Sequence, residues 1–570
     1  MRRRITTSYF SARKFRDSYL LNMKIALAQL NYHIGNFESN TEKIITTIKK
    51  SRKNGVDLII FSELAICGYP PKDLLERKEF VEKSKSALEK VAGHCIDISI
   101  VVGGPSVNPH PKGKNLYNSA YFISNGKIES IHNKTLLPNY DIFDEYRYFE
   151  PNTEFSLVEL KGKKIAITIC EDLWEKQPVD NNFSKSELYT ISPMEELSKL
   201  NPDFVVNIAA SPFSYNQQDL RTNILKATSK RYALPIFYVN QIGAHTELIF
   251  DGDSLVMNSK GEVAKRLNYF EEDYQIVNLE EIETQKAEAR NVDYIEKIHD
   301  ALILGLKDYF GKMGFTKTTL GLSGGIDSAV TVVLAERALG KENVRVLLMP
   351  SEFSSDHSIK DAIDLAENLG IQYDIVPIQN IFQEFQKSLG PIFEDLPFNV
   401  AEENIQARIR GTLVMGLSNK FGHILLNTSN KSESAVGYGT LYGDMNGGLS
   451  VLGDVYKTDV FKLAWFINKD KEVIPENSIV KPPSAELRPD QKDSDSLPDY
   501  DVLDGILFRY IEKNMSSEEI IQDGFEKVTV QKTIRLVNMN EYKRFQTPPI
   551  LRVSSKAFGF GRKIPLVAKH

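Results

Sequence analysis

The chain has 570 residues, more than one hydrophobic core usually serves, so we expect at least two domains. Its composition is that of a globular protein, with 42% hydrophobic and 26% charged residues, and its net charge of −6 gives no reason to expect nucleic-acid binding. It has no apolar stretch long enough to span a bilayer, and its three cysteines are too few for a disulfide framework. These features predict a cytoplasmic protein with no nucleic-acid or membrane partner.

Residues 1–22 differ from the rest of the chain because they are basic, with Asp17 as their single acid. A transit peptide, an upstream start codon and a disordered tail would each explain this composition. A credible first strand begins at Met23. We therefore expect a disordered extension over residues 1–22 that carries no function.

The first half of the chain alternates apolar β runs with helical patterns. We expect strands at residues 24–30, 57–64, 98–104, 164–172, 204–209 and 236–241, and helices at residues 40–52, 80–92, 194–200 and 221–232. Turn-forming residues at 124–127 and 258–261 predict two β-hairpins. Near residues 279–290 the sequence becomes acidic and loses β character. We therefore predict a domain over residues 23–278 and a linker over residues 279–296.

The second half opens with an amphipathic helix around residues 294–310 and then repeats a strand–helix–strand pattern. We expect its strands at residues 318–322, 344–349 and 373–377, and its helices at residues 329–339 and 358–369. Gly340 and Gly370 stand where a helix C-cap is expected. The pattern predicts a second domain over residues 297–570, with an α/β fold built on a Rossmann-like, doubly wound parallel sheet.

A glycine-rich segment, Leu320-Gly-Leu-Ser-Gly-Gly-Ile-Asp-Ser-Ala329, connects the first strand of this domain to a helix. Such a turn directs backbone N–H groups and a helix N-terminus at one point, which makes a phosphate site. It lacks the lysine of a Walker A loop and carries Asp327 instead, an acid that suits a phosphate site mainly when Mg²⁺ lies between the two. The segment resembles the pyrophosphate loop of ATP pyrophosphatases. This resemblance implies ATP as a co-substrate and Mg²⁺ as a cofactor.

Three residues of the first half suggest a second chemistry: Glu63, Lys134 and Cys170. A carboxylate can take the proton of a thiol, and a lysine ammonium can stabilise an oxyanion. Each residue alone has an ordinary explanation, because cysteine is often a core residue and glutamate and lysine are usually solvated. Their flanking segments, together with Glu145, resemble the nitrilase, or carbon–nitrogen hydrolase, superfamily. The resemblance implies an αββα sandwich, a Glu–Lys–Cys triad and Glu145 as an accessory catalytic residue.

Further segments of the second half carry a more specific resemblance. They are Pro350–Ser355, Ala401–Gly411, Asn427–Glu433, Gly437–Asp444, Lys481–Leu487 and Glu541–Arg544. Together with both candidate sites they resemble the glutamine-dependent NAD⁺ synthetase family over essentially Met23 to the C-terminus. The resemblance implies a ligase that hydrolyses glutamine at Cys170 and uses the ammonia to convert deamido-NAD⁺ to NAD⁺, the last step of NAD⁺ biosynthesis. ATP would form an acyl adenylate, with pyrophosphate and then AMP as products.

The resemblance also assigns binding residues by position. For glutamine they are Tyr140, Ser211 and Gln217, the last of which departs from a basic residue common in the family, so that Arg221 could take its place. For ATP they are Leu322, Ser323, Gly324, Gly325, Ile326, Asp327, Ser328, Thr428 and Lys457. For deamido-NAD⁺ they are Asn404, Glu433, Tyr438, Gly439, Thr440, Leu441 and Lys543. The ligands for Mg²⁺ are Asp327 and Glu433.

Three other interpretations remain open from the sequence. The chain could be another glutamine-dependent adenylating amidoligase, an amidase with a non-catalytic nucleotide-binding domain, or a nucleotide-sensing scaffold without enzyme activity. Intact Asp327 and Glu433 argue against a dead nucleotide site, and the joint presence of Glu63, Lys134 and Cys170 argues against a scaffold. The family resemblance further implies an ammonia channel between the two sites and a homo-oligomer.

Overall fold

The computed structural model describes residues 23–175, 188–288, 290–394, 396–489 and 491–569. The predicted extension over residues 1–22 lies outside these residues. Contacts divide the chain into two compact units. The first comprises the residues up to Pro212, Gln217–His245 and Phe250–Asn291, and the second comprises Phe213–Asn216, Thr246–Ile249 and the chain from Val292 onward. Each unit has a hydrophobic core of its own.

The first unit is built on two six-stranded sheets, of order β14-β1-β2-β3-β4-β5 and β13-β12-β9-β8-β7-β6. The strands of the first sheet are β1 (Lys24–Gln29), β2 (Leu58–Ile60), β3 (Ser99–Val107), β4 (Leu116–Ser124), β5 (Lys127–Asn133) and β14 (Asp273–Asn278). Those of the second are β6 (Leu157–Leu160), β7 (Lys163–Ile169), β8 (Phe204–Ala209), β9 (Ile236–Asn240), β12 (Leu255–Met257) and β13 (Val263–Arg266). A separate two-stranded ribbon joins β10 (Ile242–His245) and β11 (Leu248–Asp251). Both predicted hairpins are confirmed, as β4–β5 and β12–β13.

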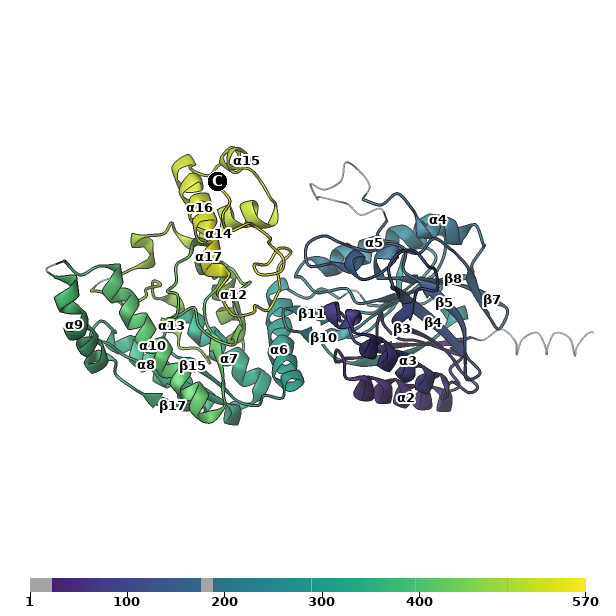
Figure 1. The fold of residues 1–570 in the computed structure, drawn as a ribbon, viewed down its shortest axis with the longest axis horizontal. Coiled ribbons are helices and arrows are strands. Elements are labelled where there is room, and N and C mark those ends of the chain that lie inside the picture. The colour runs from purple at the N-terminus through teal and green to yellow at the C-terminus, as the bar shows by residue number, and fades with distance from the viewer. Residues whose placement is uncertain (1–22, 176–187, 289, 395, 490, 570) are drawn as a thin grey trace, which may run out of the picture. The chain divides into compact units, whose positions relative to one another are not determined.

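The helices of this unit include α2 (Phe37–Lys53), α3 (Lys78–Ala92), α4 (Pro193–Ser198) and α5 (Gln217–Tyr232). In Figure 1, α2 and α3 lie on one side of the strands, and α4 and α5 lie on the opposite side. One core cluster packs Ile44 and Leu88 of these helices against the first sheet, and a larger one packs Leu58 of the first sheet with Val206 of the second. Because the central strands are buried on both faces, they are apolar runs rather than alternating ones. The predicted αββα sandwich is confirmed.

The second unit is built on a five-stranded parallel sheet of order β17-β16-β15-β18-β19. Its strands are β15 (Thr318–Gly321), β16 (Val344–Leu348), β17 (Gln372–Ile375), β18 (Ile424–Asn427) and β19 (Leu449–Ser450). Its longer helices are α6 (Tyr294–Met313), α7 (Ile326–Leu339), α8 (Asp356–Leu369), α9 (Gln379–Phe393), α10 (Val400–Phe421), α12 (Lys457–Ile467) and α16 (Lys527–Met539). Its shorter helices are α11 (Lys431–Val436), α13 (Glu476–Val480), α14 (Tyr500–Leu507), α15 (Ser517–Gln522) and α17 (Glu541–Arg544). The strand order reverses direction at β15, which confirms the predicted doubly wound sheet.

Two predicted strands are shorter than their apolar runs. The run at residues 164–172 stops being a strand at Ile169, because Cys170 has a φ of 43° and a 3₁₀ turn, η3 (Cys170–Leu173), follows. The run at residues 57–64 is a strand only over Leu58–Ile60, and Leu64 has a φ of 46°. Residues with side chains seldom adopt positive φ, and such positions concentrate at functional sites. Apolar periodicity carries no signal for them.

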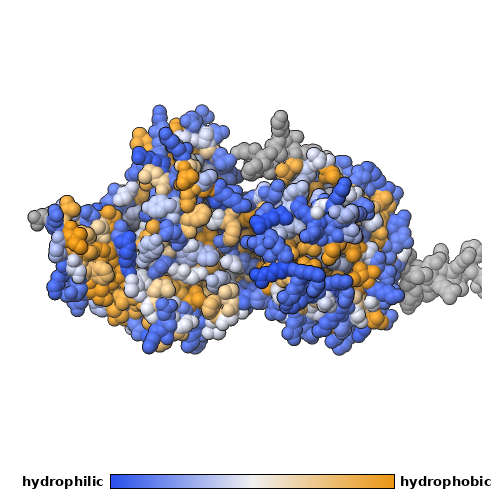
Figure 2. All heavy atoms as spheres, viewed as in Figure 1, coloured by the Kyte–Doolittle hydropathy of each residue, from blue (hydrophilic) through white to orange (hydrophobic). Residues whose placement is uncertain are grey.

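Hydrophobic side chains gather on the surface over α9 and the residues that follow it (Figure 2). In this region Phe385, Ile392, Leu396 and Phe398 are exposed. An exposed apolar patch is typical of an interaction surface. No helix in the described ranges is long and apolar enough to cross a membrane.

Gly103 in β3 has no room for a side chain. A Cβ at this position would lie 2.3 Å from the backbone nitrogen of Leu64 and 2.7 Å from Glu63 Cα. We expect Gly103→Ala to destabilise the first unit by about 1–3 kcal/mol, because backbone atoms would have to move. Gly104→Ala is the matched control, since the nearest atom to its Cβ would be 3.5 Å away in the Tyr121 ring. Denaturant unfolding followed by near-UV circular dichroism measures both variants, and equal midpoints would contradict this account of β3.

Candidate active sites

The candidate catalytic residues of the first unit lie where strands end. Lys134 follows β5 directly, Cys170 follows β7 directly, and Glu63 comes shortly after β2. Strands β7, β8 and β9 are parallel neighbours, so the residues that follow them share one sheet edge. The carboxyl ends of parallel strands are the usual location of a site in an α/β fold.

Lys134 is the centre of the first candidate site. Its ammonium donates to Glu63 Oε1 at 2.8 Å and to both carboxylate oxygens of Glu145 at 2.9 Å. Glu63 and Lys134 are completely buried and Glu145 is 6% exposed. Glu145 also accepts a hydrogen bond from the Tyr69 hydroxyl at 2.9 Å. The structure thus brings three of the four predicted catalytic residues together as one buried ionic cluster.

Cys170, the fourth, lies within the electric field of this cluster. Burial raises the pKa of its thiol well above the usual value, Glu63 raises it further, and Lys134 opposes them. The resting group is therefore a thiol that needs a base before it can act as a nucleophile. Burial lowers the pKa of the Lys134 ammonium, but Glu145 and Glu63 more than reverse this effect and hold it well above its usual value. Lys134 therefore provides a permanent positive charge beside the thiol.

A single carboxylate fixes the turn that carries Cys170. Asp172 accepts hydrogen bonds at 2.9 Å from each of three backbone N–H groups, those of Thr135, Leu136 and Ile169. It therefore ties the loop after β5 to the turn after β7, which keeps the ammonium and the thiol in one relative position. The sequence analysis did not single out Asp172, although its place two residues after the candidate nucleophile is a usable signal.

Glu171, next to Cys170, was also missed from the sequence. Its buried carboxyl accepts hydrogen bonds from the hydroxyl of Tyr140 at 2.8 Å and from that of Tyr189 at 2.7 Å. Burial raises the pKa of Glu171 to about 7. Tyr140, a predicted glutamine contact, is therefore held beside a carboxyl group that neighbours the thiol. A carboxylate at this place would suit the ammonium of a ligand.

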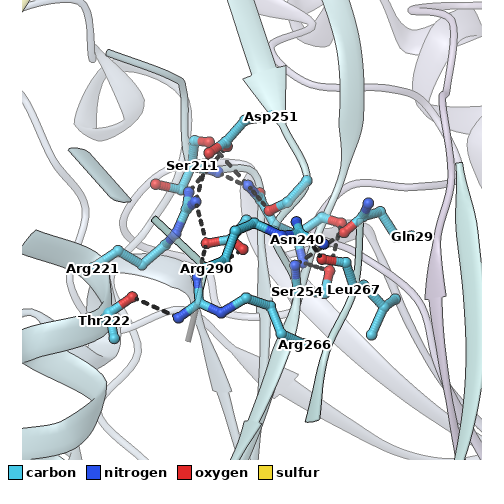
Figure 3. A network of polar contacts seen from close by, with 12 residues as sticks. Gln29, Ser211, Arg221, Thr222, Asn240, Asp251, Ser254, Arg266, Leu267 and Arg290 are labelled. Atoms are coloured by element: carbon cyan, nitrogen blue, oxygen red, sulfur yellow. Dashed lines mark hydrogen bonds and ion pairs between the residues drawn. The ribbon is translucent and has the colours of Figure 1, made fainter. Parts of the chain in front are cut away.

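The loop after β8 is fixed through its backbone (Figure 3). Asn240 accepts from the N–H of Ser211 at 2.8 Å, and donates to the carbonyls of Ser211 at 3.1 Å and Gly252 at 3.0 Å. The preceding residue, Ala210, donates its N–H to Glu63 Oε2 at 2.9 Å. The predicted glutamine contact Ser211 is therefore anchored between the ionic cluster and Asn240, a residue that the sequence analysis did not identify.

Gln217 and Arg221 both lie on α5, and Gln217, its first residue, is half-buried. Arg221 is 1% exposed and donates to Asp251 at 2.7 and 3.1 Å and to Asp253 at 3.3 Å. Figure 3 shows the guanidinium turned toward Asp251. Arg221 is thus part of a buried ion-pair network and joins α5 to the end of β11, at Asp251, and to Asp253 just after it. The sequence suggested Arg221 as a replacement for a basic residue at position 217, and its guanidinium is here paired with two carboxylates.

In the second unit, the glycine-rich loop lines a pocket of about 330 Å³. The predicted residues that line it are Leu322, Ser323, Gly325, Ile326, Asp327, Ser328, Thr428, Glu433, Tyr438 and Lys457. Gly324 has a φ of 78°, and a Cβ there would lie 2.1 Å from the carbonyl oxygen of Ser358, so the turn requires glycine. The N-terminus of α7 faces this loop, an arrangement suited to phosphate.

A second buried lysine lies in this pocket. Lys457 donates to Asp327 at 2.5 Å and to Glu433 at 3.4 Å, and Asn430 donates to the other oxygen of Asp327 at 2.9 Å. Burial, followed by the charge of Asp327, raises the pKa of Glu433 to about 8. Two carboxyl groups therefore share one ammonium, and a further cation beside them would favour the ionised form of Glu433.

Within the described ranges, no three His, Cys, Asp or Glu side chains converge as a metal-binding group. Mg²⁺ is commonly held by one or two carboxylates together with substrate phosphates and water. Asp327 and Glu433 fit this pattern, because they are adjacent and face a pocket with a phosphate-binding loop.

The other residues predicted for deamido-NAD⁺ form a cluster beside Tyr438. They are Asn404, Gly439, Thr440, Leu441 and Lys543. The Thr440 hydroxyl donates to Asn404 Oδ1 at 2.7 Å, and the Lys543 ammonium donates to two backbone carbonyls, those of Gly437 and Gly439, at 2.8 Å. The structure therefore places Gly439, Thr440 and Leu441 on one loop, and the side chains of Asn404 and Lys543 bond to that loop.

Comparisons with known proteins match both units. Residues 24–288 match the carbon-nitrogen hydrolase family, and residues 298–547 match the NAD synthase family. A glutamine-dependent NAD(+) synthetase from Synechocystis sp. is 47% identical over 552 residues, which cover 95% of this chain and 98% of that protein. A second one, from Acinetobacter baylyi, is 43% identical over 96% of this chain and 98% of its own length.

Solved structures give the same picture. The glutamine-dependent NAD⁺ synthetase of Acinetobacter baumannii, in complex with ADP, is 40% identical with a TM-score of 0.76, and the match covers 96% of this chain and 98% of that one. The structure of a glutamine-dependent NAD(+) synthetase from Cytophaga hutchinsonii has a TM-score of 0.80 at 21% identity over 96% and 98% of the two chains. This second likeness supports the fold alone.

Loss of the Lys134 ammonium would leave two buried carboxylates without a cation. We expect Lys134→Met to destabilise the first unit by about 3–5 kcal/mol at neutral pH. The pKa of Glu145, which burial already raises, would rise further. A folded-state pKa above the unfolded value gives stability at low pH that is lost as pH rises, so the deficit should grow with pH.

Adding Glu145→Gln to Lys134→Met removes one of the two buried charges and should recover part of the loss. Unfolding midpoints of wild type, single and double variants between pH 5 and pH 8 measure both effects. A deficit that is independent of pH would contradict the assignment of a buried ionic cluster.

Proposed function

Because the chain belongs to the glutamine-dependent NAD⁺ synthetases, we propose that its two sites divide one amidation between them. The first site would release ammonia from glutamine, and the second would use ATP and that ammonia to convert deamido-NAD⁺ to NAD⁺. We assign residues 23–278 to the glutaminase domain, residues 279–296 to a linker and residues 297–570 to the synthetase domain. The observation that carries the proposal is that each unit holds a complete ionic cluster, centred on Lys134 in one and on Lys457 in the other.

In the glutaminase, Glu63 takes the proton of the Cys170 thiol as the sulfur attacks the carboxamide carbon of glutamine. The Lys134 ammonium stabilises the oxyanion of the tetrahedral intermediate, and Glu145 keeps that ammonium in place. Glu63 then returns the proton to nitrogen, the carbon–nitrogen bond breaks, and ammonia leaves a glutamyl thioester. Water, deprotonated by Glu63, attacks the thioester and releases glutamate and the thiol. The high pKa of Cys170 supports this need for a base.

Glutamine is distinguished from other amides by its α-ammonium and α-carboxylate. Glu171, with Tyr140 on its carboxyl group, supplies an anion beside the thiol for the α-ammonium. Ser211 lies on the loop that Asn240 and Glu63 anchor, and would contact the substrate from the other side. Gln217, at the start of α5, would donate an uncharged hydrogen bond where the family often has a cation.

In the synthetase, the nicotinate carboxylate of deamido-NAD⁺ attacks the α-phosphate of ATP, and pyrophosphate leaves. Backbone N–H groups of the glycine-rich loop and the Lys457 ammonium stabilise the charge that builds on the phosphates. Asp327 and Glu433 would hold Mg²⁺, which would supply positive charge to this site. Uncharged ammonia then attacks the acyl adenylate, AMP leaves, and NAD⁺ forms. Thr428 would contact ATP, and the Tyr438–Leu441 loop with Asn404 and Lys543 would contact deamido-NAD⁺.

Ammonia is mostly the unreactive NH₄⁺ in neutral water, so a sheltered route between the sites would preserve it. We propose such an ammonia channel and an assembly of several identical chains. The exposed apolar side chains over α9, including Ile392 and Leu396, support an association surface on the synthetase unit.

The test of this function is Cys170→Ala, assayed for NAD⁺ formation with glutamine or with ammonium chloride as the nitrogen donor. We expect a loss of at least about 1,000-fold with glutamine, because the nucleophile is gone, and a change of less than about twofold with ammonia. Cys95→Ala is the matched control, since Cys95 is also a buried cysteine but lies in the helix-packed core. Equal loss with both donors would contradict the two-site assignment.

Asp327→Asn tests the synthetase site. It removes a carboxylate that pairs with Lys457 and faces the phosphate loop, so NAD⁺ formation should fall at least about 100-fold with either donor. Glutamate release from glutamine should persist. Asp364→Asn, which alters a surface pair with Lys360 on α8, is the control and should leave both activities unchanged. Normal pyrophosphate release by Asp327→Asn would remove this residue from the site.

A further inference from the structure

Asn118, on β4 between β3 and β5 of the first sheet, contacts all three charged residues of the Lys134 cluster. Its Nδ2 donates to Glu63 Oε1 at 2.7 Å and to Glu145 Oε2 at 3.3 Å. Its backbone carbonyl accepts the N–H of Lys134 at 2.8 Å. Asn118 is 1% exposed, so these bonds form in a region from which water is excluded.

The charge balance of the cluster explains why an amide donor matters there. Glu63 and Glu145 share the single ammonium of Lys134, which leaves an excess negative charge in a buried site. Burial raises the pKa of the Glu145 carboxyl, so the cluster tends to take up a proton. A hydrogen bond donated to an ionised carboxylate opposes proton uptake. Asn118 donates to both carboxylates and adds no negative charge.

The other end of the same amide shows that the position is not optimised for packing. Among the described residues, no donor reaches the buried Oδ1 of Asn118. An unsatisfied buried carbonyl destabilises a protein, and an apolar side chain of similar size would avoid the penalty. If the amide were turned over, Oδ1 would face the two carboxylates in place of Nδ2, and acceptor would then lie against acceptor. The orientation is therefore set by the needs of the carboxylates.

We propose that Asn118 is a positioning residue of the glutaminase, which holds the Glu63 carboxylate aimed so that it can accept the Cys170 proton. The inference rests on the proposed glutaminase and adds a residue to it. The groups that face this carboxylate pair are Lys134 after β5, Tyr69 after β2, and Cys170 and Glu171 on η3. Of these, Lys134 is the cation, and Asn118 is a neutral donor that reaches both carboxylates.

The test uses the full-length protein with Asn118→Ala and Asn118→Asp, and Ser119→Ala as a matched control. Ser119 is the next residue of β4, is equally buried, and bonds Asn133 and Ser106 instead. Glutamate release is measured as kcat/KM from about pH 5.5 to pH 9.5, and ammonia-dependent NAD⁺ formation is measured in parallel. We expect Asn118→Ala to lower kcat/KM for glutamate release about 10- to 100-fold at neutral pH. The acidic limb of its pH profile should move to higher pH, and its activity should partly recover above pH 9.

Asn118→Asp separates charge from shape. Aspartate fills the same space as asparagine but places a third carboxyl group beside those of Glu63 and Glu145. The loss of kcat/KM in Asn118→Asp at neutral pH should therefore exceed that in Asn118→Ala. A packing role predicts the opposite order. It also predicts an equal loss at every pH, so a profile of wild-type shape in Asn118→Ala, or a milder loss in Asn118→Asp, would overturn the proposal.

A second measurement does not depend on glutamine turnover. Iodoacetamide alkylation of Cys170, followed by mass spectrometry of its peptide, reports how readily the thiol loses its proton. We expect Asn118→Ala to need a higher pH for the wild-type alkylation rate, and an unchanged rate would count against the proposal. Failure of the underlying function looks different, because wild-type protein would then release no glutamate and Cys170→Ala would match it with both nitrogen donors.

Discussion

Each unit of this protein places one buried ammonium between two carboxylates. Lys134 joins Glu63 to Glu145, and Lys457 joins Asp327 to Glu433. Removing charges from water is expensive, and an apolar triad of the same size would often be as stable or more so. The clusters are therefore best understood through the reactions they support. In the first cluster the ammonium would stabilise an oxyanion, and a carboxylate would transfer a proton. In the second cluster the ammonium would bind a phosphate, and the carboxylates would bind a metal ion.

The fold supports the first cluster by hydrogen bonds that fix the backbone of the surrounding loops, in addition to the packing of side chains. Cys170 and Leu64, the residue after Glu63, have positive φ. The backbone is therefore strained at or next to both candidate reacting groups. Asp172 accepts from three N–H groups around the turn that carries Cys170, and Asn240 bonds the N–H and carbonyl of Ser211. Gly103 lets the chain at Glu63 approach β3. Such over-determined loops keep a reactive geometry that the isolated segments would not adopt.

The sequence predicts the architecture well because its strands are buried on both faces and its helices begin and end at recognisable caps. It also identifies Glu63, Lys134, Cys170 and the glycine-rich loop, since these lie in segments with a specific family resemblance. It does not reveal Asn118, Asp172 or Asn240, because their partners are distant in the chain and single polar residues next to strands have no periodic pattern. The end of the strand before Cys170 is misplaced for a related reason, since a positive φ at a residue other than glycine leaves no compositional trace. Arg221 shows the converse: a cation at a promising position is neutralised by Asp251 and Asp253, which only the fold brings to it.

One edge strand of the first sheet, β14, comes from the opposite end of the first unit to its neighbour β1. The two strands pair along the whole length of β1, from Lys24–Asn278 to Gln29–Asp273. During synthesis on the ribosome, β1 emerges early and then waits for nearly the entire unit to be translated before this neighbour arrives. Its apolar residues, among them Ile25 and Leu27, therefore border an unpaired edge in the nascent chain, a state prone to association with other chains. The same pairing sets the shortest fragment that can be produced as an independent glutaminase unit, because a gene truncated before residue 273 would encode a sheet that can never acquire its last strand.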